Sequence, residues 1–313
     1  MTLQQLRGLC EVVHSGYSVS RAAHALHTSQ PAVSKLMRQL ECAVGATIFV
    51  RSRGRVMGLT GVGEEVLELA RRVLQDTDAL TDLVAERTRQ DRGVLKIGTT
   101  HFHARHTLLD VLLKFSQRYP AVDMHVMQGN PEEAMRWVAE GRIHVGVSTL
   151  PDAMPDTVAT LPAYPIERCI ITPLQHPLLG LENITLEDLA RYPIVSYDAV
   201  YESGAILEQA FLKCGLKPRI AVKATDPHVI KAYVAAGFGI AMVGNLTIEQ
   251  EDSARLGVID ARHLFPSTHV HLCLRRGEFL RGYVYDFIES IAPAWTRNEV
   301  EGEMRPGRNA ASR

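Results

Sequence analysis

The chain has 313 residues, of which 46% are hydrophobic and 22% are charged, and its formal net charge at pH 7 is -1. This composition predicts a globular protein of two or three compact units. It excludes a bilayer-spanning segment of roughly 18 to 20 apolar residues, and the N-terminus lacks the pattern of a secretory signal. The five cysteines are scattered and never in CxxC spacing, which argues against a disulfide framework or a zinc site and predicts a cytoplasmic location.

Positive charge is concentrated at the N-terminal end. Residues 1–60 contain seven Lys and Arg residues and two Glu residues, a local charge of +5, so that the rest of the chain sums to -6. A basic patch on a near-neutral chain is typical of a nucleic-acid-binding module attached to another domain.

The N-terminal region predicts three helices followed by a β-wing. Apolar residues at helical spacing between residues 3 and 13 predict the first helix, and Ser18 can cap a second helix with a narrow, alanine-rich face. Ser29 is a good N-cap for a third helix, because Pro31 then lies in the first turn, where its missing N–H costs nothing. Residues 51–55 can form a basic hairpin with a glycine at its tip.

Two short helices and a wing of this kind can probe the DNA major groove. Gln30 and Ser34 can hydrogen-bond base edges, the first-turn amides suit a phosphate, and the wing arginines can neutralise the backbone. A solvated basic face on a helical bundle is the alternative, which the register of cap, turn and wing disfavours. The candidate DNA-binding residues are Ser29, Gln30, Pro31, Ser34, Lys35, Arg38, Arg51, Arg53 and Arg55.

A long helix is predicted from about Glu64 to Arg89, a length of roughly 39 Å at 1.5 Å per residue. Its single apolar seam has roughly coiled-coil spacing and needs a partner. We therefore expect residues 64–90 to hold a homodimer together. The seam consists of Val66, Leu69, Val73, Leu80 and Val84.

Beyond residue 93, short apolar strands alternate with helices, which predicts parallel sheets covered by helices. The alternation restarts near residue 168, and a late strand is expected at residues 271–274. This arrangement indicates two similar α/β lobes with a ligand cleft between them. After Trp295 the chain is polar, and we expect a frayed tail.

Ligands of such lobes bind beyond the carboxyl ends of the strands, where hydroxyl groups and helix-start amides favour a small anion. Ordinary capping of strand ends is the alternative for the threonines, and we give it less weight. The candidate effector-binding residues are Thr99, Thr100, His101, Phe102, His103, Ser148, Thr149, Glu202, Thr225 and Asp226.

The histidines at positions 101, 103 and 106 raise the question of a metal site. Only two of the three can easily converge, and no acidic or cysteine ligand is near them in sequence. We therefore predict no metal here and expect His106 on a helix surface. The glycines between residues 237 and 244 lack the strand-turn-helix order of a dinucleotide loop, so they predict a turn that leads into a strand.

Three N-terminal motifs are specific as a set. They are Ala22-Ala23-x-x-Leu26-x-x-Ser29-Gln30-Pro31-Ala32-Val33-Ser34, the Leu40-Glu41 pair and Gly45…Phe49-x-Arg51. Together they resemble the winged helix-turn-helix of the LysR-type transcriptional regulators. Within that family the chain is similar to the CysB subgroup, on segments such as Thr99-Thr-His101, Gln128-Gly129 and Ala224-Thr-Asp226.

The resemblance implies a winged helix-turn-helix domain (1–60), a linker helix (61–92), a two-lobed effector domain like that of periplasmic binding proteins (93–296) and a polar tail (297–313). It implies a non-enzymatic regulator of sulfur, cysteine or sulfonate metabolism genes. Its partners would be double-stranded DNA, further copies of itself as a dimer or tetramer, and RNA polymerase. No cofactor is implied. The effector would be a small molecule such as sulfate or a sulfur metabolite, contacted best by Thr100 and Thr149.

Four positions depart from the subgroup: Phe102, His103, Ile166 and Glu202 replace threonine, glutamine, tryptophan and threonine. A carboxylate at Glu202 would repel an anion unless it is protonated or paired with His101 or His103. The effector is therefore expected to be larger, partly apolar or zwitterionic. Regulation of an unrelated catabolic pathway, an architectural DNA binder, and a solute-binding protein or enzyme on the same fold are the alternatives.

Overall fold

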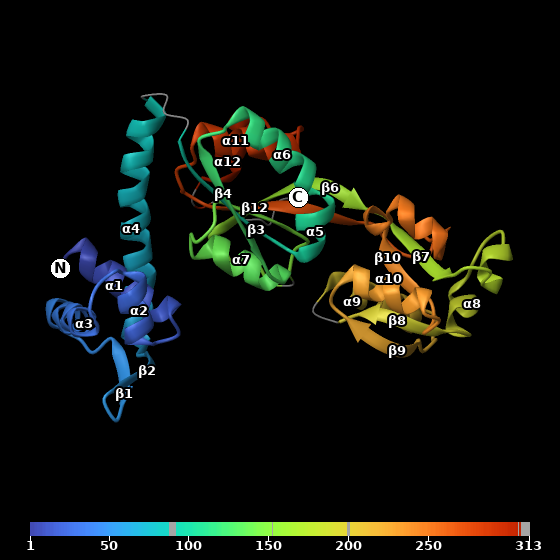
Figure 1. Cartoon of the computed structure of the whole chain (residues 1–313), viewed down its shortest axis with the longest axis horizontal. Coiled ribbons are helices and arrows are strands. Elements are labelled where there is room, and N and C mark those ends of the chain that lie inside the picture. Colours follow the sequence, from blue (N-terminus) through green and yellow to red (C-terminus); the bar gives the residue numbers. More distant parts are fainter. Residues whose placement is uncertain (88–91, 152, 199–200, 306, 308–313) are drawn as a thin grey trace. The chain divides into compact units, whose positions relative to one another are not determined.

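The structure is a computed structural model that describes residues 1–87, 92–151, 153–198, 201–305 and 307 (Figure 1). It divides into two compact units, which are described separately, namely residues 1–90 with 278–281 and residues 91–277 with 282–313. Among the described residues, no helix combines the length and the apolar character that crossing a membrane requires.

The first unit is the winged helix-turn-helix that the sequence predicts, followed by the long helix. Leu9, Val33, Leu40 and Ile48 are fully buried in its core. The elements are α1 (Leu3–His14), α2 (Val19–Ala25), α3 (Gln30–Val44), β1 (Phe49–Ser52), β2 (Arg55–Leu59) and α4 (Gly61–Arg87).

Local chemistry explains why these elements start and turn where they do. The hydroxyl groups of Ser18 and Ser29 each accept a hydrogen bond from the amide three residues ahead, at 3.4 Å, which satisfies a donor that a helix start leaves free. At the wing tip, Arg53 and Gly54 have φ angles of 48° and 80°. These are the left-handed conformations that a two-residue hairpin turn needs.

The Glu41 carboxylate fastens the wing to α3. Its Oε1 accepts hydrogen bonds from the amides of Ile48 at 3.1 Å and Phe49 at 3.2 Å, and its Oε2 accepts one from the Arg51 guanidinium at 2.8 Å. Gly63 of α4 packs so closely that an added Cβ would lie 2.2 Å from the Ile48 carbonyl oxygen. These contacts hold α3, the wing and the start of α4 together.

Helix α4 begins earlier than predicted, at Gly61 rather than Glu64, and residues 88–90 of the predicted helix lie outside the described residues. One predicted seam residue is placed differently, because Val66 packs against the core of the first unit. The other seam side chains form an apolar face that is exposed among the described residues. Their exposed fractions are 56% for Leu69, 41% for Val73, 67% for Leu80 and 62% for Val84.

The first lobe of the second unit is a five-stranded sheet in the order β4-β3-β5-β12-β6. β3 is parallel to β4 and β5, and the returning β12 is antiparallel to β5 and β6. Its strands are β3 (Gly93–Thr99), β4 (Val122–Gln128), β5 (Val145–Ser148), β6 (Val158–Ile166) and β12 (Thr268–Arg275), and its helices are α5 (His101–His106), α6 (Leu108–Arg118), α7 (Pro131–Ala139), α11 (Gly282–Ile291) and α12 (Arg297–Glu303).

The second lobe contains a three-stranded sheet, β10-β7-β11, and a parallel pair, β8-β9. A bridge between Ile194 and Ile240 links the two. The strands are β7 (Arg168–Pro173), β8 (Pro193–Tyr197), β9 (Arg219–Ala224), β10 (Ala241–Gly244) and β11 (Leu256–Asp260), the helices are α8 (Leu186–Ala190), α9 (Glu202–Lys213) and α10 (Pro227–Ala235), and short 3₁₀ turns are η1 (Pro177–Gly180), η2 (Asn245–Thr247) and η3 (Gln250–Ala254).

The predicted frayed tail is wrong over its first turns. Residues 297–303 form α12, because Thr296 and Glu299 make a capping box at its start and because Val300 and Met304 are buried, with exposed fractions of 1% and 4%. The tail therefore has an apolar stripe one helical turn long. This stripe was not predicted because the segment as a whole is polar.

We predict that Glu41→Ala loosens the wing, since it leaves the Ile48 and Phe49 amides without their acceptor. Losing hydrogen bonds to a charged group costs about 1.5–3 kcal/mol, so amide exchange over residues 46–60 should accelerate about 10- to 150-fold. Hydrogen–deuterium exchange of the full chain measures this change. Glu64→Ala, an exposed change on α4, is the control, and equal exchange in both variants would show that Glu41 does not hold the wing.

Candidate functional site

The predicted DNA-binding residues lie on exposed parts of the first unit, at the start of α3 and on the wing. Ser29 caps α3, and Gln30, Pro31, Lys35 and Arg38 are exposed along the first part of the helix, while Ser34 is half-buried. Arg53 and Arg55 are exposed on the wing. The geometry leaves these side chains accessible to a duplex, and their contact with DNA stays a prediction.

Arg51 differs from the other wing arginines. Its guanidinium is engaged by Glu41, and the side chain is only 37% exposed. Its first role is therefore to position the wing. Any phosphate contact would have to share a cation that already has a carboxylate partner.

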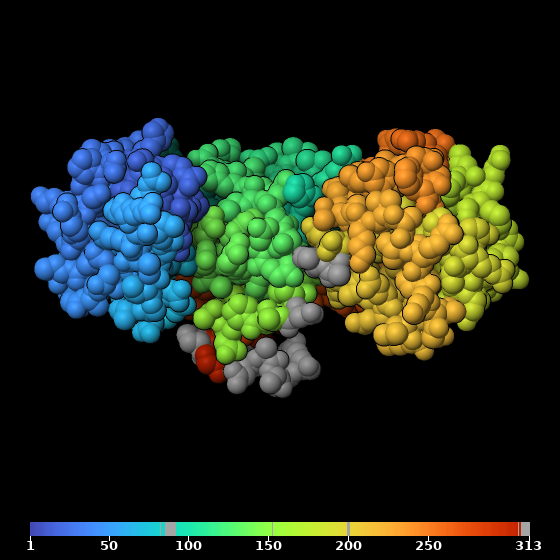
Figure 2. Space-filling view, turned by 90° about the horizontal axis from the view of Figure 1, so that it is seen from below, coloured from blue at the N-terminus to red at the C-terminus, as the bar shows by residue number. Residues whose placement is uncertain are grey.

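A cavity of about 620 Å³, including the part open to solvent, lies between the two lobes of the second unit. Figure 2 shows atoms of the first lobe, in green, meeting those of the second, in yellow and orange. Of the predicted effector-binding residues, seven line the cavity: Thr100, His101, Phe102, His103, Thr149, Glu202 and Thr225.

Thr99, Ser148 and Asp226 are not among the residues that line the cavity, and each makes a hydrogen bond within the chain. The Thr99 hydroxyl is fully buried and donates to the Val147 carbonyl oxygen at 2.7 Å. Ser148 Oγ donates to the neighbouring Thr149 carbonyl oxygen at 2.9 Å. Asp226 caps α10, with Oδ1 accepting from the next-but-one amide at 2.8 Å. For Thr99 this bond agrees with the strand-end capping alternative, and contact of the three residues with an effector stays a prediction.

The cavity wall contains the N-terminal ends of several helices. Pro131 of α7 lines it, as do Glu202 and Ser203 at the start of α9 and Pro227 at the start of α10. Helix starts carry partial positive charge and free amides. The backbone therefore favours an anionic group in this cavity, in agreement with the sequence analysis.

Arg168, which the sequence did not predict as a site residue, places a buried cation in the cavity wall. It is only 3% exposed at the start of β7, and its Nη2 donates to Thr268 Oγ1 at 2.7 Å. Its buried Nε has no hydrogen-bond partner within the described part of the chain. Burial lowers the pKa of Arg168, and the carboxylate of Glu202 is the largest influence that opposes this.

Arg168 also answers the question raised by Glu202. Of the two histidines that could pair with Glu202, His103 is the buried one: burial lowers its pKa to about 3, and its Nδ1 lies 3.1 Å from the Tyr164 hydroxyl. His103 is therefore neutral at physiological pH. The cavity thus contains a cation, an anion, and the apolar side chains of Phe102 and Ile166.

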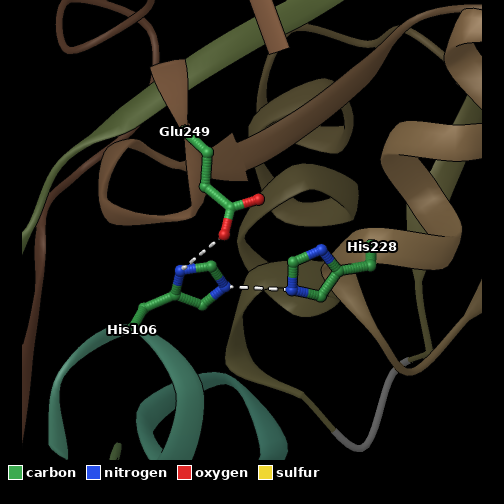
Figure 3. Close-up of side chains that lie close together, drawn as sticks. All are labelled: His106, His228 and Glu249. Carbon is green, nitrogen blue, oxygen red and sulfur yellow. Dashed lines mark hydrogen bonds and ion pairs between the residues drawn. The ribbon is translucent and has the colours of Figure 1, made fainter. Parts of the chain in front are cut away.

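Three further polar side chains meet beside the cavity (Figure 3). His106 Nε2 lies 3.1 Å from His228 Nε2, with the two rings stacked, and His106 Nδ1 lies 3.9 Å from Glu249 Oε1. The expectation of a surface position for His106 is wrong, because its side chain is only 7% exposed. Burial lowers its pKa, and His228 lowers it further. The sequence analysis missed His228 and Glu249, which are more than 120 residues further along the chain.

Comparison with known proteins places these observations in a family. Residues 3–64 match the model "Bacterial regulatory helix-turn-helix protein, lysR family", and residues 88–296 match the "LysR substrate binding domain". The HTH-type transcriptional regulator SsuR of Burkholderia cenocepacia is 37% identical over 306 residues, 97% of this chain and 99% of that protein. The regulator CysB of Haemophilus influenzae is 35% identical over 305 residues, 97% of this chain and 94% of that protein.

Solved structures show the same architecture. The cofactor-binding domain of the Cbl transcriptional regulator is 30% identical, with a TM-score of 0.66, and the match covers 69% of this chain and 94% of that one. Full-length CbnR complexed with its target DNA shares the fold at 23% identity and a TM-score of 0.61, over 93% of this chain and 99% of that one. The chain belongs to the LysR family of bacterial regulatory helix-turn-helix proteins.

Proposed function

We propose that this protein is a transcriptional regulator that binds double-stranded DNA and responds to a small effector of sulfur, cysteine or sulfonate metabolism. The observation that carries the proposal is the cavity between the lobes, where buried Arg168 has an Nε without a partner in the described structure. The names SsuR and CysB among the relatives support the assignment to sulfur metabolism. Relatives of this kind are regulators, and we propose no catalytic role. A regulator that binds DNA would be located in the cytoplasm.

The charges of the cavity favour an effector that carries both signs. A sulfonate, sulfate or carboxylate group would accept hydrogen bonds from Arg168 Nε and from the helix-start amides, since an ionised acceptor strengthens such bonds. An ammonium group would be stabilised by Glu202. The apolar Phe102 and Ile166 would contact a short carbon chain between the two charges. An amino-sulfonate fits this arrangement better than inorganic sulfate does.

The effector would act by changing the separation of the lobes, because its binding residues come from both of them. Thr100 and Thr149 belong to the first lobe, and Arg168 and Glu202 to the second. A ligand that contacts both lobes binds one relative position better and so shifts the population toward it. In a dimer or tetramer held by α4, with RNA polymerase as a further partner, this shift would alter how the wings meet DNA.

We predict that Gln30→Ala with Lys35→Ala weakens binding to a cognate DNA fragment by about 30-fold or more at fixed salt, since two lost contacts of about 1–3 kcal/mol each total at least about 2 kcal/mol. The fragment is one that the wild type selects from genomic DNA, and fluorescence anisotropy measures the affinity. Arg72→Ala removes an exposed cation of α4 and should change the affinity little. Unchanged affinity in the double variant would place recognition elsewhere.

We predict that Arg168→Met weakens effector binding by about 10- to 150-fold, the effect of losing a charged hydrogen bond of about 1.5–3 kcal/mol. Thermal unfolding of the full chain is followed with sulfate, ethanesulfonate, 2-aminoethanesulfonate and O-acetylserine, since a bound ligand raises the midpoint. Arg191→Met, at the exposed residue that follows α8, is the control.

Glu202→Gln tests the contact with the ligand's ammonium group separately from the contact with its sulfonate group. It should reduce the shift given by 2-aminoethanesulfonate and leave that of ethanesulfonate intact. If Arg168→Met retains the wild-type shifts, the cavity is not the effector site. If none of the four compounds shifts the wild type, the regulated pathway lies outside sulfur metabolism.

We predict that Leu69→Glu with Val73→Glu dissociates the dimer, because each places a carboxylate on the exposed apolar face of α4 and charges in a seam are disfavoured. Sedimentation velocity of the double variant should show mainly monomer where the wild type sediments as a dimer or tetramer. Asp78→Gln, on the opposite side of α4, is the control. A double variant that sediments like the wild type would rule out this face as the dimer contact.

A further inference from the structure

We propose that His106, His228 and Glu249 bind a divalent transition metal ion of the zinc class, and that this ion links the two lobes of the effector domain. His106 belongs to α5 in the first lobe, His228 to α10 in the second, and Glu249 directly precedes η3, also in the second lobe. Two imidazoles and a carboxylate are a common ligand set for such ions. The site is separate from the effector cavity and independent of the ligand proposed for it.

The spacing of the ligand atoms fits a single ion. One ligand atom from each of the three residues lies within 4.8 Å of the others. The Nε2 atoms of His106 and His228 are 3.1 Å apart, whereas two nitrogens on a tetrahedral zinc, each at about 2.0–2.1 Å, are separated by about 3.3–3.4 Å. A small opening of this contact admits the ion, and the Glu249 carboxylate completes three protein ligands by turning from Nδ1 toward Nε2 of His106.

Lys231 holds the Glu249 carboxylate in place and leaves it able to bind a metal ion. Lys231, only 5% exposed, donates to Asp252 Oδ2 at 2.6 Å, to the Thr247 carbonyl oxygen at 2.8 Å and to Glu249 Oε2 at 3.3 Å. Its shortest ion pair is therefore with Asp252. Partners of this kind orient a metal-binding carboxylate from outside the ligand set.

Arg105 competes for the oxygen that the metal would take. Its Nη2 lies 3.2 Å from Glu249 Oε1, and its side chain is 60% exposed. An exposed ion pair of this kind is weak, so an incoming divalent ion can displace it. Removing the Arg105 charge should therefore strengthen metal binding, which a purely structural ion pair between the lobes would not do.

The proposed metal site adjoins residues that line the effector cavity, so a bound ion would affect the cavity. The Phe102 ring lies 5.2 Å from the His106 ring, and both Phe102 and Pro227, the residue before His228, line the effector cavity. An ion that joins the histidines fixes the two walls of the cavity at one separation. Metal and effector would then change one another's affinity, as linkage requires.

The test is isothermal titration of full-length, chelator-treated protein with zinc chloride. We expect one ion per chain, with affinity at least tenfold lower in His106→Gln, in His228→Gln and in Glu249→Gln. His125→Gln, an exposed histidine of β4, should bind as the wild type does, and Arg105→Gln should bind severalfold more tightly. Far-UV circular dichroism checks that each variant is folded.

Cobalt(II) supplies a second readout of the same site. Its visible spectrum should show the bands of a four- or five-coordinate nitrogen and oxygen site, without the intense charge-transfer band of cobalt-bound thiolate. Zinc binding that survives in both histidine variants, a thiolate band, or no stoichiometric binding by the wild type would each overturn the proposal. The last result would mean that the two imidazoles share only a hydrogen bond.

Discussion

A buried guanidinium is the constraint on which the effector domain depends. Arg168 lies where the chain first crosses from the first lobe to the second, at the start of β7 and almost out of contact with water. A buried cation is costly unless it is paired and hydrogen-bonded. Thr268, close to the returning crossing, supplies one bond and Glu202 the opposing charge, while Nε remains without a partner among the described residues. We propose that an anionic ligand supplies the missing partner of Nε.

The first unit could be predicted closely because its signals are local. A cap at Ser29, a proline in the first turn and a glycine at the wing tip each determine the backbone within a few residues. What the sequence did not reveal is the long-range role of Glu41, which joins α3 to the wing through two backbone amides. The motif residues around it were recognisable as a pattern before their contacts were known.

The lobes were predicted in outline, and the missed strands have physical reasons. β6 contains Pro162 and Pro165, which argue against a strand, yet β6 lies at the edge of its sheet, where a missing amide is tolerated. β11 is short and begins Leu-Gly, so it shows little alternation. α12 escaped notice because only Val300 and Met304 are apolar within a polar segment.

Of the cavity residues, the sequence predicted those at the carboxyl ends of strands and not those at strand starts. Strand-end residues such as Thr100 and Thr149 follow from the α/β topology, whereas Arg168 begins a strand and so falls outside that rule. Glu249 is separated from His106 by more than 140 residues, and only the fold brings them together. Contacts between residues of different lobes can be predicted only when the path of the chain between the lobes is known.

We propose that a ligand bound to Arg168 changes how the first unit contacts DNA. The most direct test is DNase I footprinting of full-length wild type and Arg168→Met on the same cognate fragment, with increasing effector. We expect effector to change the extent or spacing of the protected region for the wild type and to leave the footprint of the variant unchanged. An equal effector-dependent change in both proteins would contradict it.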